Sequence, residues 1–199
     1  MFLQVHRILE CTRMVGPGLR FSIWVQGCSH GCRGCSATAT WPHKKGHSVD
    51  ISALTEKIIS SPDIEGVTFI GGEPFEQAEA LSQIARMVHF AGLSVVIFTG
   101  FTYAELLDAG KDDQIELLKY TDLLIDGPFI EEQKSLARPW VGSDNQNYIF
   151  LTERYGMQDI IAHSPAHEFH VKSNGQIISN GITISIENLE RLFRSHSKI

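Results

Sequence analysis

The sequence has few cysteines, few charged residues and no long apolar run. Of its 199 residues 4 are cysteine and 20% are charged, while 43% are hydrophobic. This composition excludes a disulfide-dense mini-protein, a disordered tail and a collagen-like fibre. No stretch of about 18 apolar residues occurs, so we expect no membrane partner.

Basic residues are in the minority, with 17 Lys and Arg against 23 Asp and Glu and a net charge of −6. Proteins that wrap duplex nucleic acid usually have a basic face, so we expect no nucleic-acid partner. Residues 1–8 do not have the positive start and apolar stretch of a secretion signal, which favours a cytoplasmic location. The length suits a single domain over 1–199.

Alternating apolar runs and amphipathic segments predict an α/β domain. Strands are expected at 20–26, 66–70, 93–99, 122–125 and about 146–151, and helices at about 50–60, 76–91, 102–108 and 112–119. Strands that alternate with helices pair in parallel and place ligands beyond their carboxyl ends. The tail predicts a β-hairpin, 167–171 and 176–184 around a turn at 173–175, and then a short helix at about 186–195.

Three of the cysteines, Cys28, Cys32 and Cys35, lie within one short segment with Cys-x3-Cys-x2-Cys spacing. Disulfides between such near neighbours are sterically awkward, and clustered thiols in a reducing compartment suggest a metal. Cys11 stands apart, and we expect it to be a small buried apolar residue.

Two kinds of metal site fit this spacing. Three thiolates can hold three corners of a cubane iron–sulfur cluster and leave the fourth iron open to a substrate or cofactor. The glycines at 27, 31 and 34 would let the backbone fold tightly around such a cluster. The alternative is a structural zinc site completed by His30, His43 or His47.

The turn Gly71-Gly72-Glu73-Pro74 follows the predicted strand at 66–70. Its two glycines allow a ligand to approach the backbone, and Glu73 can accept a hydrogen bond from an ammonium group. By itself this is a tight turn before a helix. Placed one strand after a three-cysteine loop, it favours the cluster over zinc.

The ordered motifs resemble the radical S-adenosylmethionine (SAM) superfamily and, within it, the activating proteins of glycyl-radical enzymes. The segments that carry the resemblance are 16–20, 26–35, Trp41, 71–74, 99–102, 126–129 and 142–146. The resemblance implies a partial (β/α) barrel, with a core over 1–155 and a C-terminal hairpin and helix over 156–199. It also implies a 4Fe-4S cluster on Cys28, Cys32 and Cys35, with SAM as cosubstrate.

The activity implied by the resemblance is the transfer of a radical to a partner protein. SAM is cleaved reductively to a 5′-deoxyadenosyl radical, which takes a hydrogen from a glycine of a glycyl-radical enzyme. The partner expected is an anaerobic (class III) ribonucleotide reductase, with a flavodoxin-like protein as reductant. Two alternatives remain: a radical SAM maturase acting on a peptide or small molecule, and a non-catalytic zinc or electron-transfer module.

The resemblance also assigns residues to SAM. Gly72 and Glu73 would take its amine, and Asp126 would bind a cation or orient SAM. The other positions expected at the cofactor are Gly34, Cys35, Ser36, Thr99, Asn145 and Gln146, the last two and Thr99 on the ribose or carboxylate side.

The sequence departs from the family pattern at two points. Gly34 stands where many members place an aromatic residue, and the stretch after Cys35 lacks the usual His-Asn or Tyr-Asn. Adenine packing would then come from His30 or Trp41. The pair Lys44-Lys45 is expected on an exposed loop, with docking of an acidic reductant as one use.

Replacing Cys32 with Ala should abolish SAM cleavage, because the cluster would lose an anchoring thiolate. The measurement is release of 5′-deoxyadenosine and methionine after anaerobic reconstitution with iron and sulfide and reduction with SAM present. Zinc with four protein ligands in the loop of the purified protein would contradict the underlying interpretation.

Overall fold

A computed structural model describes residues 1–162, 167–171, 174–175 and 177–181. The chain divides into two compact units, Met1–His163 and Ser164–Ile199, and each is described here by itself. The described part of the second unit is an antiparallel pair, β8 (His167–Val171) with β9 (Ile177–Gly181), which confirms the predicted hairpin. The helix predicted at about 186–195 lies outside the described residues.

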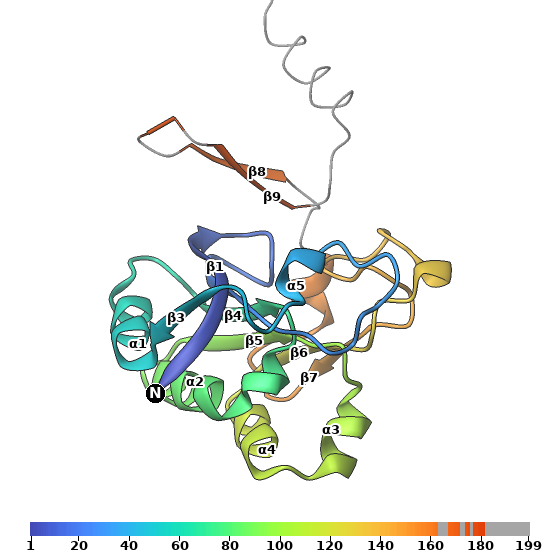
Figure 1. The fold of residues 1–199 in the computed structure, drawn as a ribbon, viewed down its shortest axis with the longest axis horizontal. Coiled ribbons are helices and arrows are strands. Elements are labelled where there is room, and N and C mark those ends of the chain that lie inside the picture. The colour runs from blue at the N-terminus through green and yellow to red at the C-terminus, as the bar shows by residue number, and fades with distance from the viewer. Residues whose placement is uncertain (163–166, 172–173, 176, 182–199) are drawn as a thin grey trace, which may run out of the picture. The chain divides into compact units, whose positions relative to one another are not determined.

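A seven-stranded sheet in the order β3-β1-β2-β4-β5-β6-β7 forms the centre of the first unit (Figure 1). Its central strands β2, β4, β5 and β6 run parallel, whereas β1, β3 and β7 are antiparallel to their neighbours. The strands are β1 (Phe2–Thr12), β2 (Arg20–Val25), β3 (His47–Asp50), β4 (Gly66–Gly71), β5 (Ser94–Phe98), β6 (Leu123–Asp126) and β7 (Asn147–Phe150). The sheet is open, and the α/β fold is the predicted partial barrel.

The helices connect the strands. They are α1 (Ile51–Ser60), α2 (Ala78–Phe90), α3 (Tyr103–Ala109), α4 (Asp112–Lys119) and α5 (Met157–Ile161), with short 3-10 turns η1 (Thr38–Thr40), η2 (Pro74–Gln77) and η3 (Glu131–Gln133). Asp50 caps the first helix, because its side chain accepts hydrogen bonds from the N–H groups of Ser52 and Ala53. The predicted helix at 76–91 begins later, since its first turn is the 3-10 turn after Pro74.

The two faces of the sheet have different coverings, as the period of two along a strand requires. In β2, Phe21, Ile23 and Val25 belong to the large core that includes residues of α1, α2 and α4. Trp24 lies on the opposite face, where Met14 and Val15 of the loop before β2 cover it.

Three expectations about the first unit are wrong. Strands β1 and β3 were not foreseen, and β7 pairs antiparallel with β6 rather than continuing the parallel series. In β1, register shifts between Val5 and Arg7 and between Leu9 and Thr12 break the alternation that identifies a strand. Cys11 is exposed rather than buried, since it lies in the second of these irregular stretches.

A buried arginine holds the amino ends of the parallel strands together. Arg20 is 0% exposed at the start of β2. Its guanidinium donates to Oγ1 of Thr68 (3.1 Å), Oγ of Ser94 (2.6 Å) and the carbonyl of Val67 (2.5 Å). These hydrogen bonds join strands β2, β4 and β5 toward their amino ends. Burial lowers the pKa of Arg20, and the nearby Tyr155 and Glu65 offset part of that effect.

Tyr155 completes this network from the segment before α5. Its hydroxyl hydrogen-bonds to a carboxylate oxygen of Glu65, lies 2.7 Å from Oγ of Ser94 and accepts from Arg20 at 3.1 Å. Burial raises the pKa of the Tyr155 hydroxyl. The Tyr155 segment is therefore fastened to the edge of the sheet where the parallel strands begin.

Replacing Tyr155 with Phe should lower the free energy of unfolding by about 1–3 kcal/mol, because Glu65, Ser94 and Arg20 each lose a buried partner. Urea unfolding of the metal-free protein measures the change. Tyr103→Phe is the matched control, since Tyr103 bonds to Asp126 through its backbone N–H, which the substitution keeps. Equal stabilities of the two variants would contradict the role given to Tyr155.

Candidate metal centre and cofactor site

The three clustered cysteines lie on the loop that follows β2, at the carboxyl edge of the parallel strands. Cys28, Cys32 and Cys35 are half-buried and free of disulfides. The glycines between and before them have positive φ, 60° at Gly31 and 78° at Gly34. Only glycine adopts these angles without strain, so the predicted tight loop is confirmed.

The backbone around the first cysteine is attached to two other segments. The N–H of Gly27 donates to the carbonyl of Thr40 (2.7 Å), and that of Cys28 donates to the carbonyl of Trp41 (3.1 Å). From the next strand, the N–H of Glu73 donates to the carbonyl of Gly27 (2.8 Å). These three backbone hydrogen bonds fix the start of the cysteine loop without any contribution from a metal.

The glycines that end β4 are required by the chain itself. A Cβ on Gly71 would lie 2.8 Å from Cα of Trp24, and one on Gly72 would lie 2.2 Å from the carbonyl oxygen of Gly27. The close approach of a ligand is therefore not the only reason for having glycine at these two positions. The two glycines allow the ends of the paired strands β2 and β4 to lie very close together, which brings the turn after β4 beside the cysteine loop.

The carboxylate of Glu76 also holds the cysteine loop in place. Oε1 of Glu76 accepts from the N–H of Ser29 at 2.8 Å, and Oε2 lies 2.7 Å from Nε2 of His43. Burial by itself would raise the pKa of Glu76, but the hydrogen bonds from His43 and Ser29 lower it overall. Glu76 therefore ties the cysteine loop to the loop around residue 43.

Glu73 is the buried centre of the site, at 1% exposed. Its Oε1 accepts from the N–H of Phe75 (2.9 Å) and from Oγ1 of Thr99 (2.8 Å). Its Oε2 accepts from the N–H of Gly100 (2.8 Å) and lies 3.2 Å from Nε2 of His30. One carboxylate therefore joins the turn after β4, the turn after β5 and the cysteine loop.

This arrangement bears on the predicted role of Glu73 toward an ammonium group. Both of its oxygens already face donors from the protein, so its evident function is to hold three loops in place. A buried carboxylate that accepts several hydrogen bonds is costly to disturb. Direct contact between Glu73 and the SAM amine stays a prediction.

His30 is held inside the site. Its ring meets Phe101 edge-on with centroids 4.5 Å apart, and a Cβ on Gly100 would lie 2.7 Å from the His30 ring. The close contact with the Glu73 carboxylate raises the pKa of His30, while burial acts in the opposite direction. His30, one of the two residues considered for adenine packing, is therefore packed between Glu73 and the turn after β5.

The remaining predicted residues form a second group at the ends of β6 and β7. Asp126 accepts from the N–H of Tyr103 (2.7 Å) and from Nδ2 of Asn147 (3.0 Å). Gln146 accepts from the N–H of Gly142 (2.7 Å) and donates to the carbonyl of Gly127 (3.0 Å). These side chains fix the loop after β6 and the start of α3.

Asn145 differs from its neighbours. Its Nδ2 donates to the carbonyl of Pro128 at 2.8 Å, but its Oδ1 is buried and has no hydrogen-bond partner. An unpaired buried acceptor is unfavourable by about 1–3 kcal/mol unless a donor reaches it. Asn145 thus has a buried acceptor that no donor of the described residues reaches.

The two groups are continuous. The N–H of Gly127 donates to the carbonyl of Phe101 (2.9 Å), and the N–H of Thr99 donates to that of Ile125 (3.0 Å). The structure therefore brings together residues from the ends of β2, β4, β5, β6 and β7, as the parallel arrangement predicts. Ser36 and Gly34 lie on the exposed side of the cysteine loop.

Sequence reasoning missed Glu131 and Glu76. The carboxylate of Glu131 is 2.8 Å from Nε of Arg33, and a Cβ on Gly34 would lie 3.0 Å from that carboxyl carbon. Glu131 thus occupies the space that an aromatic side chain at position 34 would need. Arg33, the residue before Gly34, indicated that an acidic partner lies nearby. That partner, Glu131, is about 100 residues further along the chain, so only the fold brings the two side chains together.

The donor set fits a three-cysteine cluster better than zinc. Across the described ranges, no three His, Cys, Asp or Glu side chains converge where one metal ion could sit. Of the histidines considered for zinc, His30 contacts Glu73 and His43 contacts Glu76. A cubane presents separate irons to its three thiolates, which matches three half-buried thiols spread along a loop.

Replacing Glu73 with Gln should lower the free energy of unfolding of the metal-free protein by about 1–3 kcal/mol, because an amide would face donors with a donor of its own. Urea unfolding measures the change, with Glu79→Gln on the exposed first turn of α2 as the matched control. If both variants kept the stability of the unsubstituted protein, Glu73 would not be the structural centre of the site.

Comparison with known proteins agrees with this donor set. Residues 14–149 match the family described as "4Fe-4S single cluster domain". The chain is 36% identical over 156 residues to the anaerobic ribonucleoside-triphosphate reductase-activating protein of Vibrio cholerae, covering 72% of this chain and 96% of that one. The protein of the same name from Enterobacteria phage T4 is 32% identical over 150 residues, covering 72% and 92%.

Among solved structures, QueE from Escherichia coli aligns with 51% of this chain and 54% of its own, at 20% identity and a TM-score of 0.41. No helix in the described part of the chain is long and apolar enough to cross a membrane. The cysteine motif, its position at the ends of the parallel strands and the extent of these matches lead to one assignment. The chain belongs to the family of anaerobic ribonucleoside-triphosphate reductase-activating proteins.

Proposed function

We propose that this protein is a radical SAM enzyme that generates a glycyl radical on an anaerobic ribonucleotide reductase. The observation that carries the proposal is the three-thiol loop joined through one buried carboxylate, Glu73, to the turns after β4 and β5. A cluster held by these three cysteines would lie beside loops that can hold a second ligand. The activating proteins of the family support the choice of substrate.

Cys28, Cys32 and Cys35 would hold the cluster. When bound, the cluster and SAM supply a one-electron cleavage that yields methionine and a 5′-deoxyadenosyl radical, which takes a hydrogen atom from a glycine Cα of the reductase. The protein's own contribution is to position these groups and keep water away from them.

Positioning depends on the hydrogen bonds that hold the loops. Glu73 holds the cysteine loop and the turn at Thr99-Gly100 at a constant separation, and Glu76 restrains the opposite side of the cysteine loop through Ser29. Side chains locked in this way need little reorganisation when a cofactor binds.

The assignment of SAM contacts follows the same logic. Asn145 Oδ1 is the free acceptor, so we propose that it receives a hydrogen bond from SAM. The backbone around Gly34, Ser36 and Gly72 would contact the cofactor directly. Glu73, Thr99, Asp126 and Gln146 would act mainly by fixing the loops that surround it, since their polar atoms are already engaged.

Exclusion of water follows from burial at the ends of the strands. Thr99 is 5% exposed and Asp126 is 3% exposed, although both lie at the edge of the sheet. The side chains of Thr99 and Asp126 form their hydrogen bonds within the protein, so solvent is not needed for them. A reactive radical formed beside them would meet few water molecules.

The electron would come from an external donor, for which we propose a flavodoxin-like protein. The half-buried cysteines keep the loop accessible from outside, as delivery of an electron by another protein requires. Free thiols of this kind also suit a reducing compartment, and we propose the cytoplasm.

The test is to mix the reduced, reconstituted protein with SAM and a competent anaerobic ribonucleotide reductase and to record the electron paramagnetic resonance spectrum. The expected result is the doublet of a glycyl radical, absent without SAM and absent with Cys32→Ala. The competence of the reductase is established beforehand with an activating protein known to work on it. If that reductase gave no doublet with this protein while SAM was still cleaved, the proposed substrate would be wrong.

A further inference from the structure

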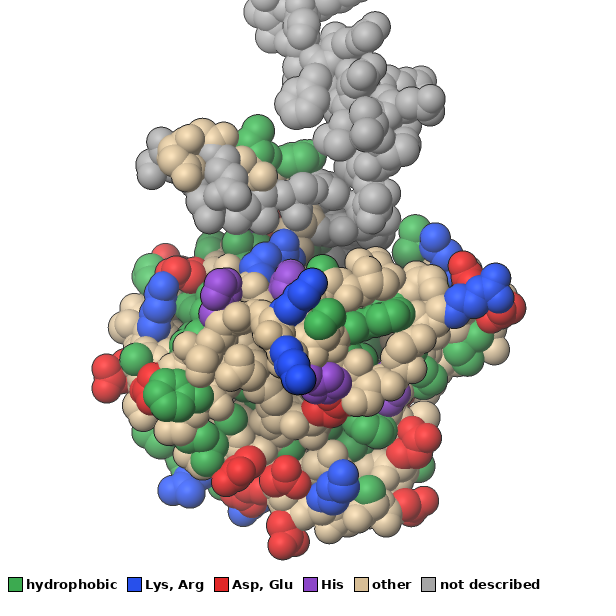
Figure 2. Space-filling model, in the orientation of Figure 1, with side chains coloured by type: hydrophobic (Ala, Val, Ile, Leu, Met, Phe, Trp, Pro, Cys, Tyr) green, Lys and Arg blue, Asp and Glu red, His purple; other side chains and the backbone are tan. Residues whose placement is uncertain are grey.

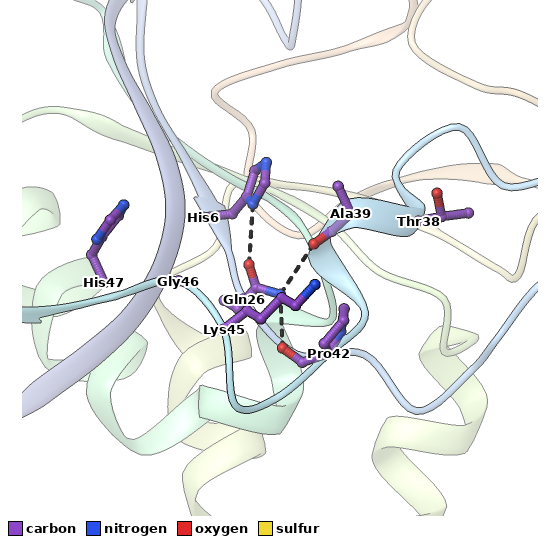
Figure 3. A pocket seen from close by; sticks show the side chains of 8 residues that line it. All are labelled: His6, Gln26, Thr38, Ala39, Pro42, Lys45, Gly46 and His47. Atoms are coloured by element: carbon purple, nitrogen blue, oxygen red, sulfur yellow. Dashed lines mark hydrogen bonds between the residues drawn. The ribbon is translucent and has the colours of Figure 1, made fainter.

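A cavity of about 450 Å³ lies outside the site described above, between β1, the end of β2 and the loop that leads into β3. Its volume is within the range of small-molecule sites, about 300–1,000 Å³. The residues that line it are His6, Gln26, Thr38, Ala39, Pro42, Lys45, Gly46 and His47 (Figure 3).

The floor of the cavity is preformed. Gln26 is 3% exposed, and its Nε2 donates to the carbonyls of Pro42 (2.8 Å) and Ala39 (3.3 Å), while its Oε1 lies 3.1 Å from Nδ1 of His6. A Cβ on Gly46 would lie 2.7 Å from the carbonyl oxygen of Val5, so the loop lies directly on β1. A ligand would therefore meet residues that are already held in place, and its binding would not have to order a flexible loop.

The cavity is lined by one cationic side chain, that of Lys45, and by no acidic one, in a chain whose net charge is −6. Lys45 is exposed and, within the part of the chain that the structure describes, makes no ion pair. His6 and His47 add two rings that become cationic when protonated. Figure 2 shows Lys, Arg and His side chains gathered near the centre of this face.

The cationic and apolar parts of the lining are distinct. In Figure 3 the His6 ring faces the carboxamide of Gln26, and Ala39 and Thr38 lie beyond it. Pro42, Ala39 and the Thr38 methyl group offer apolar contact. A ligand that matches both parts has an anionic head and a compact organic body.

We propose that this cavity binds a nucleotide-sized phosphate ester, a nucleoside diphosphate being the simplest that fits. Phosphate oxygens would accept hydrogen bonds from Lys45 and from the His6 ring, and the base would lie against Pro42 and Ala39. A concave site with a preformed floor suits a small molecule better than the flat acidic surface of a protein.

Ligand binding in the cavity would affect the metal site, because the loop that lines the cavity also holds the start of the cysteine loop. The carbonyls of Thr40 and Trp41, between lining residues 39 and 42, accept the hydrogen bonds from Gly27 and Cys28. Occupancy of the cavity would stiffen the segment that holds the first cysteine.

The experiment is anaerobic calorimetric titration of the reconstituted protein with ADP, with SAM in excess so that any adenine subsite of the cofactor is filled. Lys45→Gln should weaken ADP binding about tenfold, the loss of one charge-assisted contact. Lys44→Gln is the matched control, because Lys44 is exposed on the same loop but does not line the cavity, and it should leave binding unchanged.

Three results would overturn the proposal: no binding of ADP, equal weakening in the two variants, or adenosine binding as tightly as ADP. Equal weakening would indicate a diffuse cationic surface of the kind that docks an acidic protein. Circular dichroism of both variants verifies that they are folded. Because the titration needs neither reductase nor radical formation, its failure is distinguishable from a failure of the proposed function.

Discussion

The buried carboxylate of Glu73 is the interaction on which the site depends. It gathers the N–H groups of Phe75 and Gly100, the hydroxyl of Thr99 and the ring of His30 around two oxygens. These contacts come from three segments at the carboxyl edge of the sheet: the turn after β4, the turn after β5 and the cysteine loop. Because a buried carboxylate is stable only while its donors remain in place, these turns cannot separate without leaving the charge exposed to an apolar interior. The separation of the cysteine loop from the loops after β4 and β5 is therefore fixed.

A comparable device works at the opposite edge with the charge reversed. There the guanidinium of Arg20 gathers acceptors from β4 and β5, and Tyr155 links it to Glu65. The parallel strands are thus held by a buried cation where they begin and by a buried anion where they end. Apolar packing between these edges stabilises the sheet, and the two polar networks set its register and the positions of its loops.

Much of the fold could be predicted from the sequence, and the failures have physical causes. The runs that became β4 and β5 are buried on both faces, so their continuous apolar character identified them. Strand β1 was missed because register shifts near His6 and Cys11, in its pairing with β2, disrupt its alternation. The antiparallel direction of β7 follows from the loop at 127–146, which returns without a crossover helix, and no local pattern encodes that choice.

The sequence by itself determined the ligand chemistry: three thiols at a spacing suited to a cluster, glycines to bend around it, and an acidic turn one strand later. Residue type and spacing are sufficient there, because the three cysteines are close along the chain. Tertiary structure alone decided how the remaining side chains are used. Glu73, predicted to meet a ligand, is enclosed by donors from the protein, whereas Asn145 retains a buried acceptor. Hydrogen-bond partners far apart along the chain become neighbours only when the strands align, so their assignment waits for the fold.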